Sequence, residues 1–183
     1  SNRVGSFAAK GETCCNDLYR FTLTPEQPGP LVQAPIAMNG SNVQPVRASS
    51  EVLMDLAKHF PLKLYFHNDE PEPRSWSTTT PLAYSQCYTS YIALESEYAS
   101  ANSDDPGIGR FFEQAVRKGY SELAELATAL WPVLEEGKSV TLETRGHASP
   151  LARTDYNRNL SRRRIESLRN HLRTVDNGRL RPY

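Results

Sequence analysis

The chain is poor in cysteine, carries no excess of either charge and lacks a long hydrophobic run. Its 183 residues contain three cysteines, Cys14, Cys15 and Cys87, which are too few for a disulfide framework. The 21 basic and 21 acidic residues balance, so no overall charge attracts the chain to nucleic acid or to an anionic membrane. No stretch approaches the roughly 20 consecutive apolar residues of a membrane span, and we predict no transmembrane segment.

The spacing of cysteines and histidines argues against a metal site. Cys14 and Cys15 are adjacent, and because a bridge between neighbours is strained, two free thiols are favoured over a vicinal disulfide. Cys87 is predicted to be a small core residue. The four histidines do not lie at ligand spacing near the cysteine pair: His59, His67, His147 and His171. We predict neither a metal nor another cofactor.

Composition and the placement of proline and glycine divide the chain into three parts. Because it opens at Ser1 without a signal peptide, we expect it to be a piece of a longer protein. Residues 1–24 contain one strand, Asp17–Leu23, which cannot bury itself alone and is predicted to be the terminal strand of a preceding domain. Residues 25–50 are rich in Pro, Gly, Asn and Ser and are predicted to be a linker. Residues 51–183 form the compact domain.

The first half of this domain predicts a helix, a strand and a second helix. A short helix is expected over Glu51–His59, and apolar alternation predicts a strand over Leu62–Phe66. Another helix follows Pro81 and carries an apolar and aromatic stripe. Helical spacing alone explains this stripe, so its members are interpreted as packing residues: Tyr84, Tyr88, Tyr91, Leu94 and Tyr98.

The second half predicts a helical stretch, a strand and a long final helix. Apolar residues at helical spacing run from Phe111 to Val133, and alternation returns over Val140–Arg145. The final helix is expected to be capped by Thr154 or Asp155 and to reach about Val175. The order of elements predicts an α+β fold, a sandwich of helices packed on one small β-sheet, with an N-terminal extension.

Arg164 is the most informative residue of the final helix. It belongs to a stripe at four-residue steps, Leu160, Arg164, Leu168 and Leu172, and so faces the core side. A guanidinium keeps its proton, so a partly buried one needs an anion, from the protein or from a ligand. Two structural interpretations stay open beside the binding site: the side chain snorkels to water, or it closes an internal ion pair.

The stretch around Arg164 resembles the signature of the OmpA-like peptidoglycan-binding domain, which OmpA C-terminal domains, Pal lipoproteins and MotB share. The matching positions are Gly146-His147-Ala148, Tyr156-Asn157, Leu160, Arg163-Arg164 and Leu168. LYFHNDEP at 64–71 is similar to the first strand of that family, and the resemblance covers roughly residues 50–183. It implies an OmpA-like sandwich on a small mixed β-sheet.

The resemblance also implies noncatalytic binding of the peptidoglycan stem peptide at its meso-diaminopimelate residue. By position, Arg164 matches the arginine that holds the ligand carboxylate, and Asn157 matches an asparagine of the same pocket. Ser149 stands where the family has the aspartate for the ligand ammonium, and Asp69 is preferred as its replacement. The expected ligand-binding set is Arg164, Asn157, Ser149, Asp69, Asn68, Ala148 and Leu160.

The N-terminal segment carries a second resemblance. SNRVGS and ETCCNDLYRF look like the last blade strand of a periplasmic β-propeller. A propeller followed by an OmpA-like domain with the turn ASPLARTDYN is similar to the C-terminal part of a periplasmic lipoprotein of the type IX secretion system. This implies a periplasmic location, tethering to the outer membrane by a lipid anchor outside this sequence, and other secretion-system proteins as partners.

Three alternatives to wall binding have some support in the sequence. The serine at position 149 keeps open a protein-interaction module of the same fold that has lost its wall ligand. A nucleic-acid module would use an arginine face, which net neutrality disfavours and a solvated helix face explains: Arg158, Arg162, Arg163, Arg169 and Arg173. An enzyme would need a triad of His147, Ser149 and Asp155, and no oxyanion element accompanies these residues.

Overall fold

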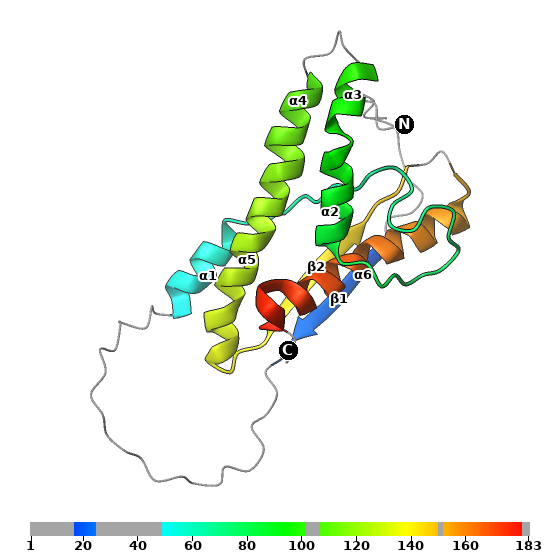
Figure 1. Ribbon diagram of the computed structural model, residues 1–183. Helices are drawn as coiled ribbons and strands as arrows, with labels where there is room; N and C mark the ends of the chain where they lie inside the picture. Colours follow the sequence, from blue (N-terminus) through cyan, green and yellow to red (C-terminus); the bar gives the residue numbers. More distant parts are fainter. Residues whose placement is uncertain (1–16, 25–48, 102–106, 150–151, 181–183) are drawn as a thin grey trace, which may run out of the picture.

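The computed structural model describes residues 17–24, 49–101, 107–149 and 152–180. These residues form an α+β structure of helices and one small sheet (Figure 1). In chain order the elements are β1 Asp17–Leu23, α1 Ser49–Ala57, α2 Tyr84–Ala93, α3 Glu95–Ala101, α4 Gly107–Phe111, the π-helical turn η1 Phe112–Arg117, α5 Lys118–Glu135, β2 Val140–Gly146 and α6 Thr154–Gly178.

The described sheet has two antiparallel strands. β1 pairs with β2 along its whole length, from Asp17 opposite Gly146 to Leu23 opposite Val140. Alternation sets the inner face, since Leu142 is buried while its neighbours are exposed. The prediction that β1 belongs to a preceding domain is therefore wrong for residues 17–23, because β2 supplies the partner that the strand needs. The described sheet is also antiparallel, where a mixed one was expected.

The predicted strand Leu62–Phe66 is wrong, although the segment runs without helical structure. Among the described residues it joins no ladder. The Tyr84 hydroxyl serves both backbone groups of Tyr65: it accepts from the amide at 3.2 Å and donates to the carbonyl at 3.1 Å. The segment also lies directly on α5, where a Cβ at Gly119 would overlap the Lys63 carbonyl oxygen. A side-chain hydroxyl and close packing thus replace strand pairing.

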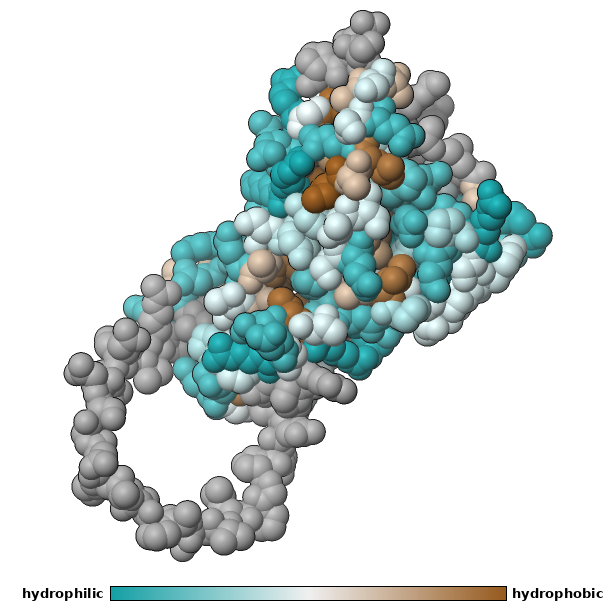
Figure 2. Space-filling view, viewed as in Figure 1, coloured by the Kyte–Doolittle hydropathy of each residue, from teal (hydrophilic) through white to brown (hydrophobic). Residues whose placement is uncertain are grey.

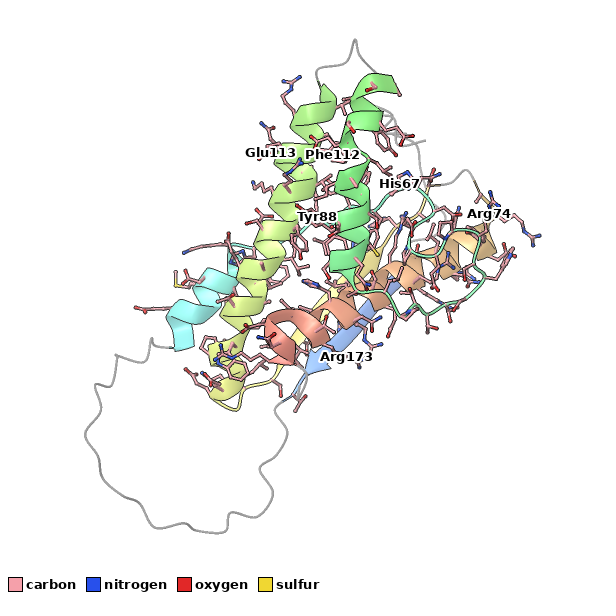
Figure 3. The ribbon with its side chains drawn as sticks, in the orientation of Figure 1. His67, Arg74, Tyr88, Phe112, Glu113 and Arg173 are labelled. Atoms are coloured by element: carbon pink, nitrogen blue, oxygen red, sulfur yellow. The ribbon has the colours of Figure 1, made fainter. Side chains whose placement is uncertain are left out.

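The aromatic stripe packs as predicted. Tyr84 and Tyr91 are buried. Tyr88, labelled in Figure 3, stacks on Tyr120 of α5 with ring centroids 3.9 Å apart. The helix expected after Pro81 is divided at Leu94 into α2 and α3. Cys87 is a buried free cysteine of the same core, as predicted. The stripe is accounted for by packing between helices.

The remaining helices and β2 follow the predictions closely. The stretch Phe111–Val133 lies within continuous helix from α4 to α5, and β2 extends one residue beyond the expected strand. The regular part of α6 ends at Thr174, because Val175, Asp176 and Asn177 leave helical geometry. α1 begins at Ser49, inside the expected linker; the rest of that linker, residues 25–48, and residues 1–16 with Cys14 and Cys15 lie outside the described part.

The segment 67–82 passes around the N-terminal half of α6 (Figure 1), and it positions the candidate site. Gly146 at the end of β2 lets this strand approach α6 closely, since a Cβ there would lie 2.6 Å from the Ser161 carbonyl oxygen. The surface in view is largely hydrophilic, with apolar residues in small separate groups (Figure 2). Within the described ranges, no helix is both long enough and apolar enough to span a bilayer.

Candidate functional site

The 67–82 segment has no helix or strand, so its backbone acceptors need partners from elsewhere. Side chains of α6 supply the donors. Four of them bind eight carbonyl oxygens of this segment: Asn159 binds that of Trp76, Arg163 those of Pro71, Ser75 and Ser77, Arg164 those of His67 and Glu70, and Asn170 those of Thr80 and Leu82. The site is therefore built by one helix holding one irregular segment.

Arg163 is the most deeply buried member of this set, with 0% of its surface exposed. Its Nε donates to the Pro71 carbonyl at 3.0 Å, and its Nη1 donates to those of Ser75 at 2.6 Å and Ser77 at 2.7 Å. Its guanidinium also lies 5.7 Å from the centroid of the Tyr156 ring. The interpretation of Arg163 as part of a solvated arginine face is wrong, because the 67–82 segment covers it.

Arg164 joins the 67–82 segment to the end of β2. Its Nε donates to the Glu70 carbonyl at 2.9 Å, its Nη1 to that of His147 at 2.6 Å and its Nη2 to that of His67 at 3.3 Å. The guanidinium lies 5.1 Å from the centroid of the Phe66 ring. Burial lowers the pKa of Arg164 to about 10, a shift that the nearby Asp69 carboxylate opposes. Arg164 therefore keeps its positive charge at neutral pH.

The two adjacent guanidinium groups have no close carboxylate. Among the described residues, no Asp or Glu oxygen lies within ion-pair distance of Arg163 or Arg164. Carbonyl oxygens and aromatic rings stabilise these charges but do not neutralise them. The internal ion pair considered for Arg164 is thus not formed within the described residues. The arrangement suits a ligand that brings an anion.

Asn157 binds backbone carbonyls on either side of residues 150–151, between β2 and α6. It is buried, and its Nδ2 donates to the carbonyls of Ser149 at 2.7 Å and Ala152 at 3.1 Å. Residues 150–151 themselves lie outside the described part. Ser149 is exposed and Ala148 is half-buried, while Leu160 is buried one turn further along α6. The expected pocket asparagine thus holds the backbone that carries Ser149.

Asp69 lies beside the start of α6. Its carboxylate accepts hydrogen bonds from the Tyr156 hydroxyl and from the backbone amide of Arg74, the latter at 2.9 Å. Burial raises the pKa of Tyr156, and the hydrogen bond to Asp69 adds to the shift. Asp69 has a positive φ of 60°, so a tight turn aims its side chain. Its neighbour Asn68 is exposed.

Asp155 takes a different role from the expected helix cap. The N-cap of α6 is Arg153, which makes no side-chain capping bond. Asp155 instead accepts two hydrogen bonds from the Arg153 guanidinium, at 2.8 and 3.2 Å, and one from the Tyr156 amide at 2.8 Å. The bonds from Arg153 are the main cause of its lowered pKa. In the described residues Asp155 makes no hydrogen bond to His147 or Ser149, so the three do not form a triad.

The structure brings Arg164, Asn157 and Asp69 to one end of the domain. The concave surface between α1 and α5, lined by Lys58, His59 and Glu125 among others, lies away from them. Within the described ranges, no group of three His, Cys, Asp or Glu residues is placed to hold a metal ion. The arrangement offers hydrogen-bond donors and positive charge, which suits binding of a carboxylate-bearing ligand.

Arg163, Tyr156, Asn159 and Asn170 were missed as site-building residues. A signal for three of them was present, because Asn159, Arg163 and Asn170 recur at i, i+4 and i+11 and so share one face of α6. A stripe of strong donors on a helix predicts a covering segment without secondary structure. Residues 67–73, with two prolines, are such a segment.

A scan against models of protein families found none that matches the chain, and searches of curated proteins and of solved structures likewise returned no match.

Proposed function

We propose that this domain binds the stem peptide of peptidoglycan noncovalently, through its meso-diaminopimelate residue. The observation that carries the proposal is the Arg164 guanidinium, which is charged and lies at the junction of β2, α6 and the 67–82 segment without a carboxylate partner among the described residues. A carboxylate ligand supplies the missing charge with bidentate geometry. The similarity of residues 146–168 to the OmpA-like signature supports the same ligand.

Three of the expected residues have a defined role in this proposal. Arg164 binds the ligand carboxylate, and its bond to His67, the longest of its three at 3.3 Å, is the one that exchanges most readily. Asp69 binds the ligand ammonium in place of the family aspartate, whose position Ser149 occupies. Asn157 holds the backbone of Ser149 and Ala152 beside the site.

The wider assignment rests on resemblance. An OmpA-like domain that binds the cell wall without catalysis anchors the assembly to which it belongs. We propose that this assembly is the type IX secretion system, that the domain works in the periplasm, and that a lipid anchor elsewhere in the protein tethers it to the outer membrane. Other secretion-system proteins are then its partners.

One observation favours a second function, a protein-interaction module that has lost wall binding. Each nitrogen of the Arg164 guanidinium already donates to a carbonyl of the same chain, and the Asp69 carboxylate already accepts from Tyr156. A site whose polar groups are satisfied internally loses these bonds when a ligand enters. The two functions therefore differ in whether wall peptide binds at all.

The test is calorimetric titration of the domain with a diaminopimelate-containing stem peptide, together with sedimentation on isolated sacculi. We expect Arg164→Ala to abolish binding and Arg164→Lys to weaken it about tenfold, because an ammonium cannot bind a carboxylate through a planar fork. Arg173→Ala, a change at an exposed arginine of the same helix (Figure 3), is the matched control and should bind as wild type.

Thermal unfolding of each variant separates loss of the site from loss of the fold. Equal binding by wild type and by a folded Arg164→Ala variant would refute the site assignment. A wild-type domain that binds neither stem peptide nor sacculi would refute wall binding and favour the interaction module.

A further inference from the structure

Trp76 has an exposed side chain on a tightly fixed backbone. Trp76 is 55% exposed. Side chains of α6 nevertheless bind three successive backbone carbonyls, those of Ser75, Trp76 and Ser77. Arg163 Nη1 binds those of Ser75 and Ser77 at 2.6 and 2.7 Å, and Asn159 Nδ2 binds that of Trp76 itself at 3.0 Å. A fully buried guanidinium thus holds both neighbours of an indole that remains accessible.

The ring is supported from α6 as well. It makes an edge-to-face contact with the Tyr156 ring, at 5.3 Å between centroids and 79° between planes. The Arg153 guanidinium lies 5.7 Å from the indole centroid. The Tyr156 hydroxyl in turn donates to Asp69. Trp76, Tyr156 and Asp69 therefore form a continuous row that leads from the indole to the proposed stem-peptide site.

The surroundings of the indole are polar. Among the described residues, the other large apolar side chains that are exposed are Met54 and Phe60, which belong to α1 and the segment after it. Trp76 is followed directly by the exposed hydroxyl residues Ser77, Thr78 and Thr79. A specific protein interface buries about 1,200 Å² or more with an apolar centre. A single aromatic ring bordered by hydroxyls is too small and too polar for this and fits a sugar, whose C–H face packs on an aromatic ring while its hydroxyls bind polar groups.

We propose that Trp76, supported by Tyr156, is a sugar-binding subsite that packs on the glycan strand to which the stem peptide is attached. This inference rests on the proposed function, which assigns binding of the stem peptide, and it adds binding of the attached glycan strand. Because the backbone around Trp76 is fixed before binding, little conformational entropy is lost when a sugar ring packs on the indole. The subsite makes the domain select wall peptide that is still joined to glycan over free peptide.

The first experiment observes the indole directly. The chain has two tryptophans, so Trp131→Phe leaves Trp76 as the sole tryptophan emitter. This variant is titrated with peptide-free glycan strands, with disaccharide-linked stem peptide and with stem peptide alone. We expect the two sugar-containing ligands to shift the Trp76 emission and the peptide alone to leave it unchanged.

The second experiment measures affinity. We expect wild type to bind disaccharide-linked stem peptide about tenfold more tightly than the free peptide, as for one aromatic contact in a binding site. Trp76→Ala should remove this difference and leave the affinity for free peptide unchanged. Phe60→Ala, which removes an exposed aromatic ring elsewhere, is the control and should keep the difference.

The outcomes separate the two proposals. If the peptide does not bind but glycan strands shift the Trp76 emission, the peptide assignment fails and the sugar subsite stands. If neither sugar-containing ligand shifts the emission, or if Trp76→Ala leaves the tenfold difference intact, the subsite is refuted whether or not the peptide binds. A Trp76 emission that responds to a protein partner and not to glycan would also overturn the sugar assignment.

Discussion

Replacing Arg163 by methionine removes the donor that holds three carbonyls of the 67–82 segment while keeping an apolar stem of similar length. Nε lies 3.0 Å from the oxygen of the fully buried Pro71, and leaving this acceptor unpaired costs about 2 kcal/mol. The carbonyls of Ser75 and Ser77 belong to a part-exposed segment that water can reach, so losing each of these two hydrogen bonds costs about 0.5 to 1 kcal/mol of stability.

The opposing effect is relief of the desolvation of a buried charge. The guanidinium is solvated by three carbonyl oxygens and by the Tyr156 ring, but its Nη2 is buried without a hydrogen-bond partner among the described residues, so this relief offsets part of the loss. We therefore expect Arg163→Met to lower the free energy of unfolding by about 3 kcal/mol.

Urea denaturation measures this change, and limited trypsin digestion locates it. Arg74 lies exposed within the released segment (Figure 3), and cleavage after it should accelerate in the folded variant. Arg173→Met, the same change at an exposed arginine of α6, should leave both measurements near wild type. If Arg163→Met is as stable as wild type or more stable, desolvation outweighs the carbonyl bonds, and the reasoning fails.

Three further changes test other parts of the structure. Gly119→Ala forces a Cβ onto a facing backbone carbonyl and should destabilise the protein by about 2 kcal/mol or more in urea denaturation. Gly109→Ala, at a helical position with open surroundings, should stabilise the protein by up to about 1 kcal/mol, and equal effects of the two changes would contradict the close approach at α5. Burial raises the pKa of the Cys87 thiol from 9.0 to about 11, so the stability contributed by the neutral thiol is complete below pH 9 and is lost as the pH rises to about 11. The free energy of unfolding of wild type should therefore fall relative to that of Cys87→Ala across this range, and parallel pH profiles of the two proteins would refute the shift. Tyr156→Phe removes the hydroxyl that occupies the Asp69 carboxylate, so it should tighten binding of stem peptide in calorimetry, and weaker or unchanged binding would argue against Asp69 as the ammonium acceptor.

The helices and both described strands were predictable because local pattern and burial agree in them. The stripe of Tyr84, Tyr88 and Tyr91 recurs at helical spacing, and packing against α5 and α6 is what that spacing requires. The strand Asp17–Leu23 was found for a similar reason, since an alternating segment reveals its type. Its partner was not predictable, because alternation along one strand carries no information about which distant strand completes the ladder.

The segment Leu62–Phe66 shows the limit of the same reasoning. Its alternation is real, and Leu62, Leu64 and Phe66 do pack on the core. The alternation indicates one buried face, however, and does not indicate what the backbone amide and carbonyl groups bind. In Tyr65 they bind the hydroxyl of a tyrosine nineteen residues away and not a neighbouring strand.

The sequence indicated which residues come together better than it indicated how they are held. Arg164, Asn157 and Asp69 do meet at one end of the domain, but the residue that was assigned to solvent, Arg163, is the one that holds the surrounding segment in place. The spacing of the arginines alone did not reveal this, because it places a side chain on a face and does not say what covers that face; only the further donors Asn159 and Asn170 on the same face indicate a covering segment.

Under the proposed function, the adjacent arginines divide two tasks that a single guanidinium cannot perform together. A group that must exchange its partner for a ligand carboxylate cannot also be the sole support of the segment that forms the site, since releasing its bonds would release the segment. Arg163 is wholly buried and keeps Pro71, Ser75 and Ser77 in place, so Arg164, which is part-exposed and holds His67 by a longer bond, is able to exchange that bond while the site keeps its shape. Loss of Arg163 should therefore act on binding through the position of the 67–82 segment, and loss of Arg164 through the ligand itself.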